Sequence, residues 1–186
     1  PQEVADMVEA VGADALCVHM NPAMELVQPE GDRDFTAGLQ TFQRLWAELE
    51  VPVIAKETGN GISREVATKL RSIGIRHADT SGAGGTSWVG VETLRAEGEG
   101  RALGEALWDW GIPTAASVHY CVEAGMTTIA TGGIRHGMDV ARSIALGASC
   151  AGIARNVYQA FLEGGEEGAR SFLLRIEREL RSIMLL

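Results

Sequence analysis

The sequence predicts an α/β protein with a parallel β-sheet, because short apolar runs alternate with amphipathic segments along its 186 residues. The apolar runs are brief, and some are bounded by Gly or Pro, as is typical of parallel strands buried on both faces. Strands are expected at residues 13–19, 52–57, 75–80, 127–132 and 149–154. Five such strands suit either an open doubly wound sheet or part of a (β/α)₈ barrel, and periodicity does not choose between these architectures.

Helical periodicity occupies the intervals between the expected strands. Helices are expected at residues 2–11, 35–49, 63–74, 138–146 and 166–185. Ser63 can cap the third of these helices, and Gly74 ends it. The last helix carries apolar residues on one side and Arg and Glu on the other, which is the pattern of an amphipathic helix.

Composition argues against a nucleic acid or an anionic membrane surface as a partner. The formal net charge is −9 at pH 7, which disfavours binding to polyanions. No apolar run approaches the roughly 20 residues that a membrane-spanning helix needs. Cys17, Cys121 and Cys150 are odd in number and lack CxxC spacing. We therefore expect reduced, buried thiols in a cytoplasmic protein.

The two ends of the chain look unusual. The sequence starts at Pro1, without an initiator Met and inside the first expected helix, and it ends in a run of apolar residues. We interpret residues 1–186 as a single domain that is truncated at both ends.

Polar residues follow the first two expected strands. The first strand leads into residues 19–35, which contain an imidazole, an amide and several carboxylates. The second strand ends at Lys56, which can keep its charge at a buried position only beside an anion. That anion can be a neighbouring carboxylate or a bound ligand, and position alone favours neither.

Glycine-rich loops follow the later strands. Glycines alternate with hydroxyl residues over 79–87, where the backbone can approach a ligand. Residues 131–135 combine two glycines with an Arg just before a helix, an arrangement typical of a phosphate cradle. Residues 152–156 end the fifth strand with a second Arg, and in phosphate-binding barrels the last two strands hold the phosphate. These loops therefore predict a phosphate site.

Five motifs together resemble the type 2 isopentenyl diphosphate isomerases. The motifs are His-Met-Asn-Pro at 19–22, Gln-Pro-Glu-Gly-Asp-Arg-Asp-Phe at 28–35, Lys-Glu-Thr-Gly at 56–59, Ser-Gly-Ala-Gly-Gly-Thr-Ser-Trp at 81–88 and Thr-Gly-Gly-Ile-Arg at 131–135. They occur in the family's order and span nearly the whole chain. The resemblance implies a flavin-dependent enzyme with a (β/α)₈ TIM barrel, of which this chain would hold strands four to eight with their helices.

The resemblance also implies cofactor-binding residues. Lys56 would lie against the pyrimidine edge of FMN and stabilise the anionic reduced flavin. Ser81 and Thr86 would hydrogen-bond the flavin or its phosphate tail. The FMN phosphate would be enclosed by Gly133, Ile134, Arg135, Ala154 and Arg155.

For the reaction, the resemblance implies interconversion of isopentenyl and dimethylallyl diphosphate, a small-molecule diphosphate substrate. His19 and Asn21 would face the substrate, and Glu25 would bind Mg²⁺, a hard cation suited to carboxylate and phosphate oxygens. Reduced FMN, replenished by NADPH, would act chiefly as an acid and base. The full-length enzyme is expected to be a homo-oligomer.

One position departs from the family. Where the family carries a substrate-contacting Gln, this chain has Met24, and a thioether cannot relay a proton. If Asn21 caps a short helix with Pro22 at its first position, Met24 and Gln28 share one face, so Gln28 can take over the catalytic role. Two alternatives remain open: another FMN-dependent oxidoreductase on the same barrel, and an inactive flavin-binding fragment.

Overall fold

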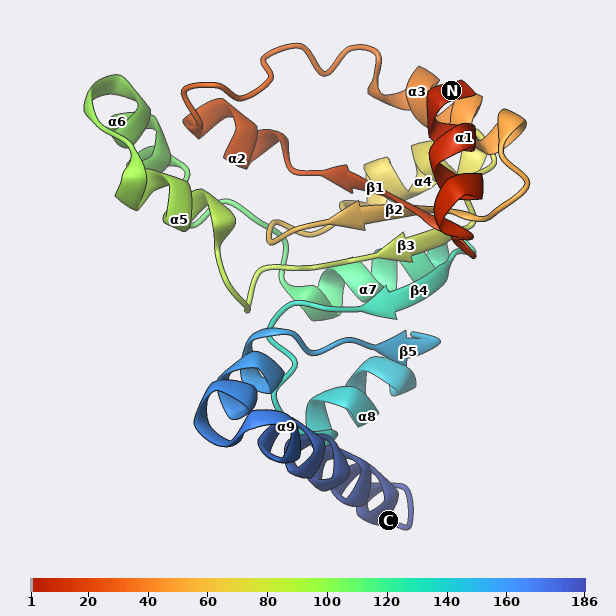
Figure 1. Ribbon diagram of the computed structural model, residues 1–186, viewed down its shortest axis with the longest axis vertical. Coiled ribbons are helices and arrows are strands. Elements are labelled where there is room, and N and C mark those ends of the chain that lie inside the picture. The colour runs from red at the N-terminus through yellow and green to blue at the C-terminus, as the bar shows by residue number, and fades with distance from the viewer. Residues whose placement is uncertain (1) are drawn as a thin grey trace.

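The structure is a computed structural model that describes residues 2–186, and its centre is a five-stranded parallel sheet (Figure 1). The strands lie side by side in chain order: β1 Leu16–Met20, β2 Val53–Glu57, β3 His77–Asp79, β4 Thr127–Ala130 and β5 Cys150–Ala151. The five expected strands are confirmed, although each pairs over fewer residues than its apolar run. Because all strands are parallel, their carboxyl ends meet along one edge, on the side of the sheet where β1 leads into the next helix.

Nine helices connect or flank the strands in the described part of the chain. They are α1 Gln2–Val11, α2 Pro22–Val27, α3 Gly38–Glu48, α4 Arg64–Ser72, α5 Trp88–Arg95, α6 Gly98–Ala106, α7 Thr114–Glu123, α8 Gly137–Ala145 and α9 Arg155–Ile183. The helices α5, α6 and α7 were not indicated by apolar spacing. The element α9 consists of two helical segments, because Gly164 and Gly165 between them have non-helical geometry. The second segment, from residue 166 to Ile183, is the expected last helix, whereas the first segment, which begins at Arg155, was not predicted.

Local chemistry explains where two of the helices begin. The Ser63 hydroxyl accepts a hydrogen bond from the Val66 amide and caps α4, as expected. The Asn21 side chain accepts a hydrogen bond from the Met24 amide, and Pro22 occupies the first turn of α2. The short helix predicted after the first strand is therefore present.

One face of the sheet packs against helices and the other is open. The main core joins β2 and β3 to α3, α4 and α7, and Figure 1 shows α4 and α7 behind the sheet. Its buried side chains include Phe42, Leu45, Val53, Ala55, Leu70 and Cys121. The alternate strand residues, such as Cys17 and Thr127, face the opposite side and are exposed. In a complete barrel this open face would be the interior.

A second, smaller core lies beyond the carboxyl ends of the strands. There Ala23 and Val27 of α2 pack against Val89 of α5 and against Ala96, which follows α5, and α6 lies against both helices. These three helices form a wall on the side where the polar loops gather (Figure 1).

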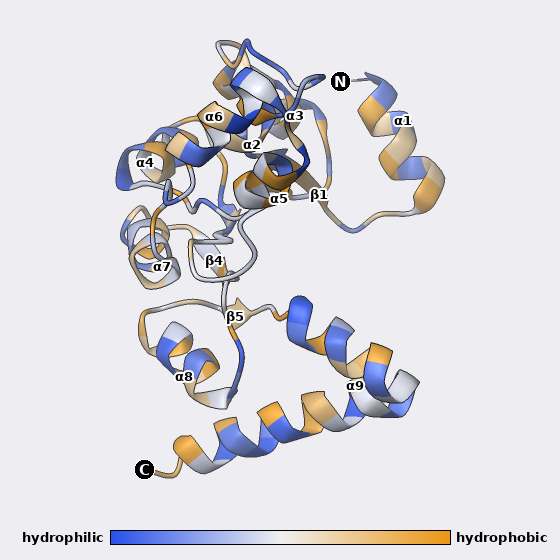
Figure 2. Cartoon of the chain, turned by 90° about the vertical axis from the view of Figure 1, so that its left-hand side faces the viewer, coloured by the Kyte–Doolittle hydropathy of each residue, from blue (hydrophilic) through white to orange (hydrophobic). Residues whose placement is uncertain are grey.

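The cysteine expectation was wrong for two of the three residues. Cys121 is buried, and burial raises the pKa of its thiol to about 12. Cys17 and Cys150 are exposed instead; both lie on edge strands, and Cys17 faces the open side of the sheet, unlike its half-buried neighbours on β1. Among residues 2–186, no helix is both long enough and apolar enough to cross a membrane. Figure 2 shows hydrophilic and hydrophobic residues mixed along α9, the longest helix.

Candidate functional site

A cavity of about 930 Å³ opens at the carboxyl ends of the strands and gathers most of the predicted site residues. Its lining includes His19, Gln28, Lys56, Ser81, Thr86, Gly133, Ile134, Arg135, Ala154 and Arg155. His19 and Lys56 lie near the carboxyl ends of β1 and β2, Gln28 follows α2, and the other residues lie beyond the ends of β3, β4 and β5. The parallel sheet brings these strand ends to one edge. Asn21 and Glu25, which were also predicted, do not line this cavity.

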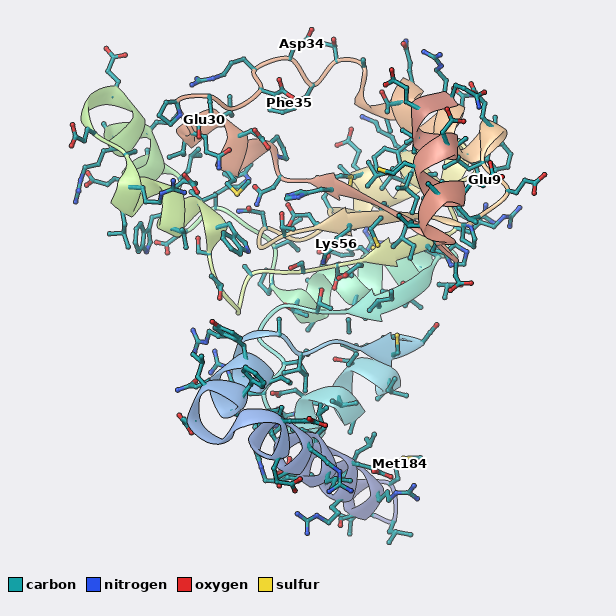
Figure 3. All side chains as sticks on the ribbon, viewed as in Figure 1. Glu9, Glu30, Asp34, Phe35, Lys56 and Met184 are labelled. Carbon is teal, nitrogen blue, oxygen red and sulfur yellow. The ribbon has the colours of Figure 1, made fainter. Side chains whose placement is uncertain are left out.

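Lys56, on β2 and labelled in Figure 3, lines the cavity and has a protein anion beside it. The register pairs His19 with Lys56 and Lys56 with Asp79, so these side chains stand in one row across three strands. The Lys56 ammonium donates to the Asp79 carboxylate over 2.8 Å. The Asp79 side chain is only 12% exposed, whereas that of Lys56 is 35% exposed and reaches the cavity. The partner of Lys56 is thus a carboxylate from the next strand.

The same carboxylate holds the loop after β4. The Thr131 hydroxyl donates a hydrogen bond to Asp79 and accepts one from the Ser81 amide, over 2.8 Å. Ser81 has a positive φ of 31°, a conformation that is strained for any residue except glycine. A chain of contacts therefore links Lys56, Asp79, Thr131 and Ser81.

Buried Glu57 organises the loop after β2. One of its carboxylate oxygens accepts hydrogen bonds from the amides of residues 58–61, over 2.6–2.9 Å. Burial raises the pKa of this carboxyl, and the four amide donors oppose the shift. Thr58 in this loop lies 2.7 Å from the His19 imidazole, measured between Oγ1 and Nε2. Glu57 thus fixes the loop whose Thr58 contacts His19, a residue predicted to face the substrate.

The two predicted residues outside the cavity have partners of their own. Asn21 is 4% exposed and caps α2, and its side-chain nitrogen donates to the Thr58 carbonyl. Glu25 accepts a hydrogen bond from the Asp32 amide over 3.1 Å. Met24 and Gln28, in contrast, both line the cavity from α2. The helix therefore presents the thioether and the neighbouring amide, rather than Asn21, to the cavity.

The loop after β4 is shaped like an anion cradle. Gly133 has a φ of 78°, and a Cβ there would lie 2.5 Å from the Gly84 carbonyl oxygen, so only glycine fits. The Arg135 guanidinium donates to the same carbonyl over 3.1 Å. These contacts hold the loops after β3 and β4 against each other.

The two helix N-termini near this cradle differ. At α8 the first amides are taken, because Glu179 accepts from Gly137 and His136 accepts from Asp139. At α9, by contrast, no side chain among residues 2–186 caps the first turn, which begins at Arg155 beside the cavity. Free amides at a helix N-terminus bind anions such as phosphate. The glycine cradle, the uncapped helix and the cavity volume together fit a flavin mononucleotide.

Sequence reasoning missed two residues that line the cavity from α5. Trp88 is partly exposed, and Glu92 is 6% exposed with its carboxylate 3.0 Å from Arg95. Both come from a helix rather than a strand end, so the strand-end argument gave no signal for them. Trp88 was visible only as the last residue of the 81–88 motif.

The described residues contain no preformed metal centre. Nowhere in residues 2–186 do three or more His, Cys, Asp or Glu side chains converge as a metal-binding set. Glu25 offers one carboxylate, so any Mg²⁺ there would need most of its oxygen ligands from substrate or water.

The fold is half of an α/β barrel whose cavity fits a flavin, and comparisons with known proteins identify its family. Residues 20–186 match the FMN-dependent dehydrogenase family, and the chain belongs to that family. It is also similar in structure to a mandelate oxidase mutant with a monooxide FMN adduct (TM-score 0.66, 22% identity) and to a sulfite-bound flavocytochrome b2 (TM-score 0.68, 19% identity). Both matches cover 99% of this chain, but 53% and 46% of those proteins. The barrel fold, present here in part, is thereby confirmed.

Curated relatives of higher sequence identity share one enzyme name. The isopentenyl-diphosphate delta-isomerases of Thermococcus onnurineus and Thermococcus kodakarensis are each 47% identical over 189 residues, covering all of this chain and 50% of each relative. That of Methanothermobacter thermautotrophicus is 48% identical over 183 residues, covering 96% of this chain and 51% of the relative. The resemblance drawn from the five motifs is therefore confirmed, and the chain spans about half the length of these relatives.

Proposed function

We propose that this chain forms part of an FMN-dependent isopentenyl-diphosphate delta-isomerase. One observation supports the proposal most strongly. The glycine cradle after β4, the uncapped N-terminus of α9 and Lys56 all line the same cavity. Family membership supports the cofactor, and the curated relatives support the reaction class.

The chain's own residues would hold FMN in two ways. Gly133, Ile134 and Arg135, with Ala154 and Arg155 at the start of α9, would bind its phosphate through amides and guanidinium groups. Lys56 would place its positive charge at the pyrimidine edge, while Ser81 and Thr86 would bind polar atoms of the cofactor.

The substrate would lie between FMN and α2. His19, held by Thr58, would face the diphosphate, and Glu25 would bind Mg²⁺ together with diphosphate oxygens. Asn21 would act through its cap on α2 and its contact with Thr58. Bound FMN, kept in its reduced form by hydride from NADPH, would supply the acid and base that the shift of the double bond requires.

Gln28 would supply the side-chain amide that Met24 lacks. Both residues line the cavity. Gln28 caps the C-terminus of α2 and lies one helical turn after Met24. The proposal predicts that Gln28→Ala lowers isomerase turnover at least tenfold while FMN binding is unchanged. Unchanged turnover would reject this role for Gln28.

Five strands do not close a barrel, so we also propose that further strands, from the same chain or another, complete the site. Tests of cofactor binding and activity therefore require the complete gene product. The first test is binding of FMN, followed by conversion of isopentenyl diphosphate after chemical reduction. A protein that binds no FMN, or binds it and converts no substrate, would contradict the proposal.

A second candidate is an FMN-dependent oxidoreductase acting on another substrate, and Met24 is the observation that favours it. The two candidates differ in one measurement. An isomerase with reduced FMN should exchange substrate protons with D₂O only when Mg²⁺ is present. Net flavin oxidation by a different substrate, with no such exchange, would favour the oxidoreductase.

A further inference from the structure

We propose that Asp79 is a positioning residue that sets the location of the Lys56 charge, and thereby the ease with which bound FMN is reduced. This inference rests on the proposed function, because it requires FMN in the cavity. Asp79 itself does not line the cavity.

The geometry places Asp79 behind the residues that do line it. Its two carboxylate oxygens have separate partners: one accepts from the Lys56 ammonium over 2.8 Å, and the other accepts from the Thr131 hydroxyl. Lys56 and Thr131 both reach the cavity, from β2 and from the loop after β4. Asp79 therefore spans the two strands on either side of its own.

Without Asp79, little would hold the Lys56 side chain in one conformation. The Lys56 side chain has four rotatable bonds, and Asp79 is its one ion-pair partner among the described residues. The register that pairs Lys56 with Asp79 fixes the carboxylate relative to the ammonium. A positioned charge beside a flavin stabilises its anionic reduced form more than a charge that samples several rotamers.

The network extends to the loop that carries Ser81. The Thr131 hydroxyl donates to Asp79, so its oxygen lone pair is free to accept the Ser81 amide. Ser81 keeps its positive φ while it is held in this way. Thus one buried carboxylate orients a lysine and also supports a strained loop at the same cavity.

Substituting Asp79→Asn separates two effects that have opposite signs. If Asp79 positions Lys56, the variant should lower the equilibrium constant for two-electron reduction of bound FMN about tenfold, which is about 30 mV more negative. If Asp79 acts only as a nearby negative charge, its removal should make reduction easier and raise the potential. The measurement is a spectroelectrochemical titration of the FMN-loaded complete gene product.

Three further single variants and one double variant complete the experiment. In Lys56→Met the potential should fall, and adding Asp79→Asn to it should lower the potential no further, because Asp79 acts through Lys56. Thr131→Val removes one contact of Asp79 but keeps the carboxylate, so the reduction potential should fall by less than in Asp79→Asn. This variant also tests the inference if Asp79→Asn does not fold. Glu105→Gln, an exposed carboxylate paired with Arg101, makes the same charge change far from the network and should leave the potential unchanged.

The outcomes distinguish this inference from the proposed function. An unaltered protein that binds no FMN overturns the proposed function and this inference with it. A protein that binds FMN but whose Asp79→Asn variant shows a raised or unchanged potential overturns the inference alone. Additive effects of Lys56→Met and Asp79→Asn would also overturn it.

Discussion

Replacing Glu57 with Ala should loosen the loop that carries Thr58 without unfolding the sheet. The substitution removes the acceptor of four amides, at residues 58–61. The amide of buried Asn60 would lose its partner with no access to water, at a cost of roughly 1–3 kcal/mol. The other three lie in half-buried residues and can recover water, so each should lose about 0.5 kcal/mol. We expect the loop to be destabilised by about 3 kcal/mol.

Hydrogen exchange at the amides of residues 58–61 measures this change directly. A loss of about 3 kcal/mol corresponds to roughly a hundredfold loss of protection, since 1.4 kcal/mol is a factor of ten. Glu57→Gln is the matched control: its amide oxygen still accepts, so protection should fall less than tenfold. Amides in the α4 core, around Leu70, should exchange as before in both variants. A Glu57→Ala variant whose loop keeps protection within tenfold of the parent would refute the reasoning.

The remaining predictions concern pH, the cradle, the core and assembly. Because burial raises the folded-state pKa of Glu57, its contribution to the free energy of unfolding is full below about pH 4.5 and is lost as the pH rises through the raised value. In Glu57→Gln, the free energy of unfolding measured by urea titration should no longer fall over this pH range. Gly133→Ala should weaken FMN binding at least tenfold by fluorescence titration, because its Cβ would meet the Gly84 carbonyl. Leu70→Ala should cost about 2–5 kcal/mol in urea unfolding, since Leu70 is fully buried. The 186-residue chain expressed alone should aggregate through its open β1 and β5 edges, and a monomeric, cooperatively melting sample would contradict this.

The regular elements were predictable where apolar spacing was strong. The strands and α1, α3, α4 and α8 follow such spacing, and the caps at Asn21 and Ser63 could be read locally. The helices α5 and α7 bury small or polar residues, including Gly90, Thr93 and Ser117, so their stripes are faint. The strands were overestimated because buried residues such as Ile75 lie beside the hydrogen-bonded ladder without joining it.

The cavity was predictable as a set of strand-end residues, but its internal contacts were not. The sequence left the anion beside Lys56 open between a carboxylate and a ligand. The answer depends on the register between β2 and β3, which places Asp79 next to Lys56. That register is set by the packing of both strands against the helices, which no local pattern encodes. The same limit applies to Glu92, whose place in the cavity depends on how α5 packs against α2.

The residues proposed for cofactor binding and those proposed for substrate chemistry lie on different elements around the cavity. The residues proposed to hold FMN come from β2 and from the loops after β3, β4 and β5. Met24, Gln28 and His19 come from β1 and α2 instead. A substitution at Met24 can therefore alter the reaction while FMN binding persists. Membership in the FMN-dependent family consequently constrains the cofactor more strongly than the substrate. The D₂O exchange experiment therefore tests which reaction occurs, isomerisation or oxidation of another substrate, which is the question that Met24 raises.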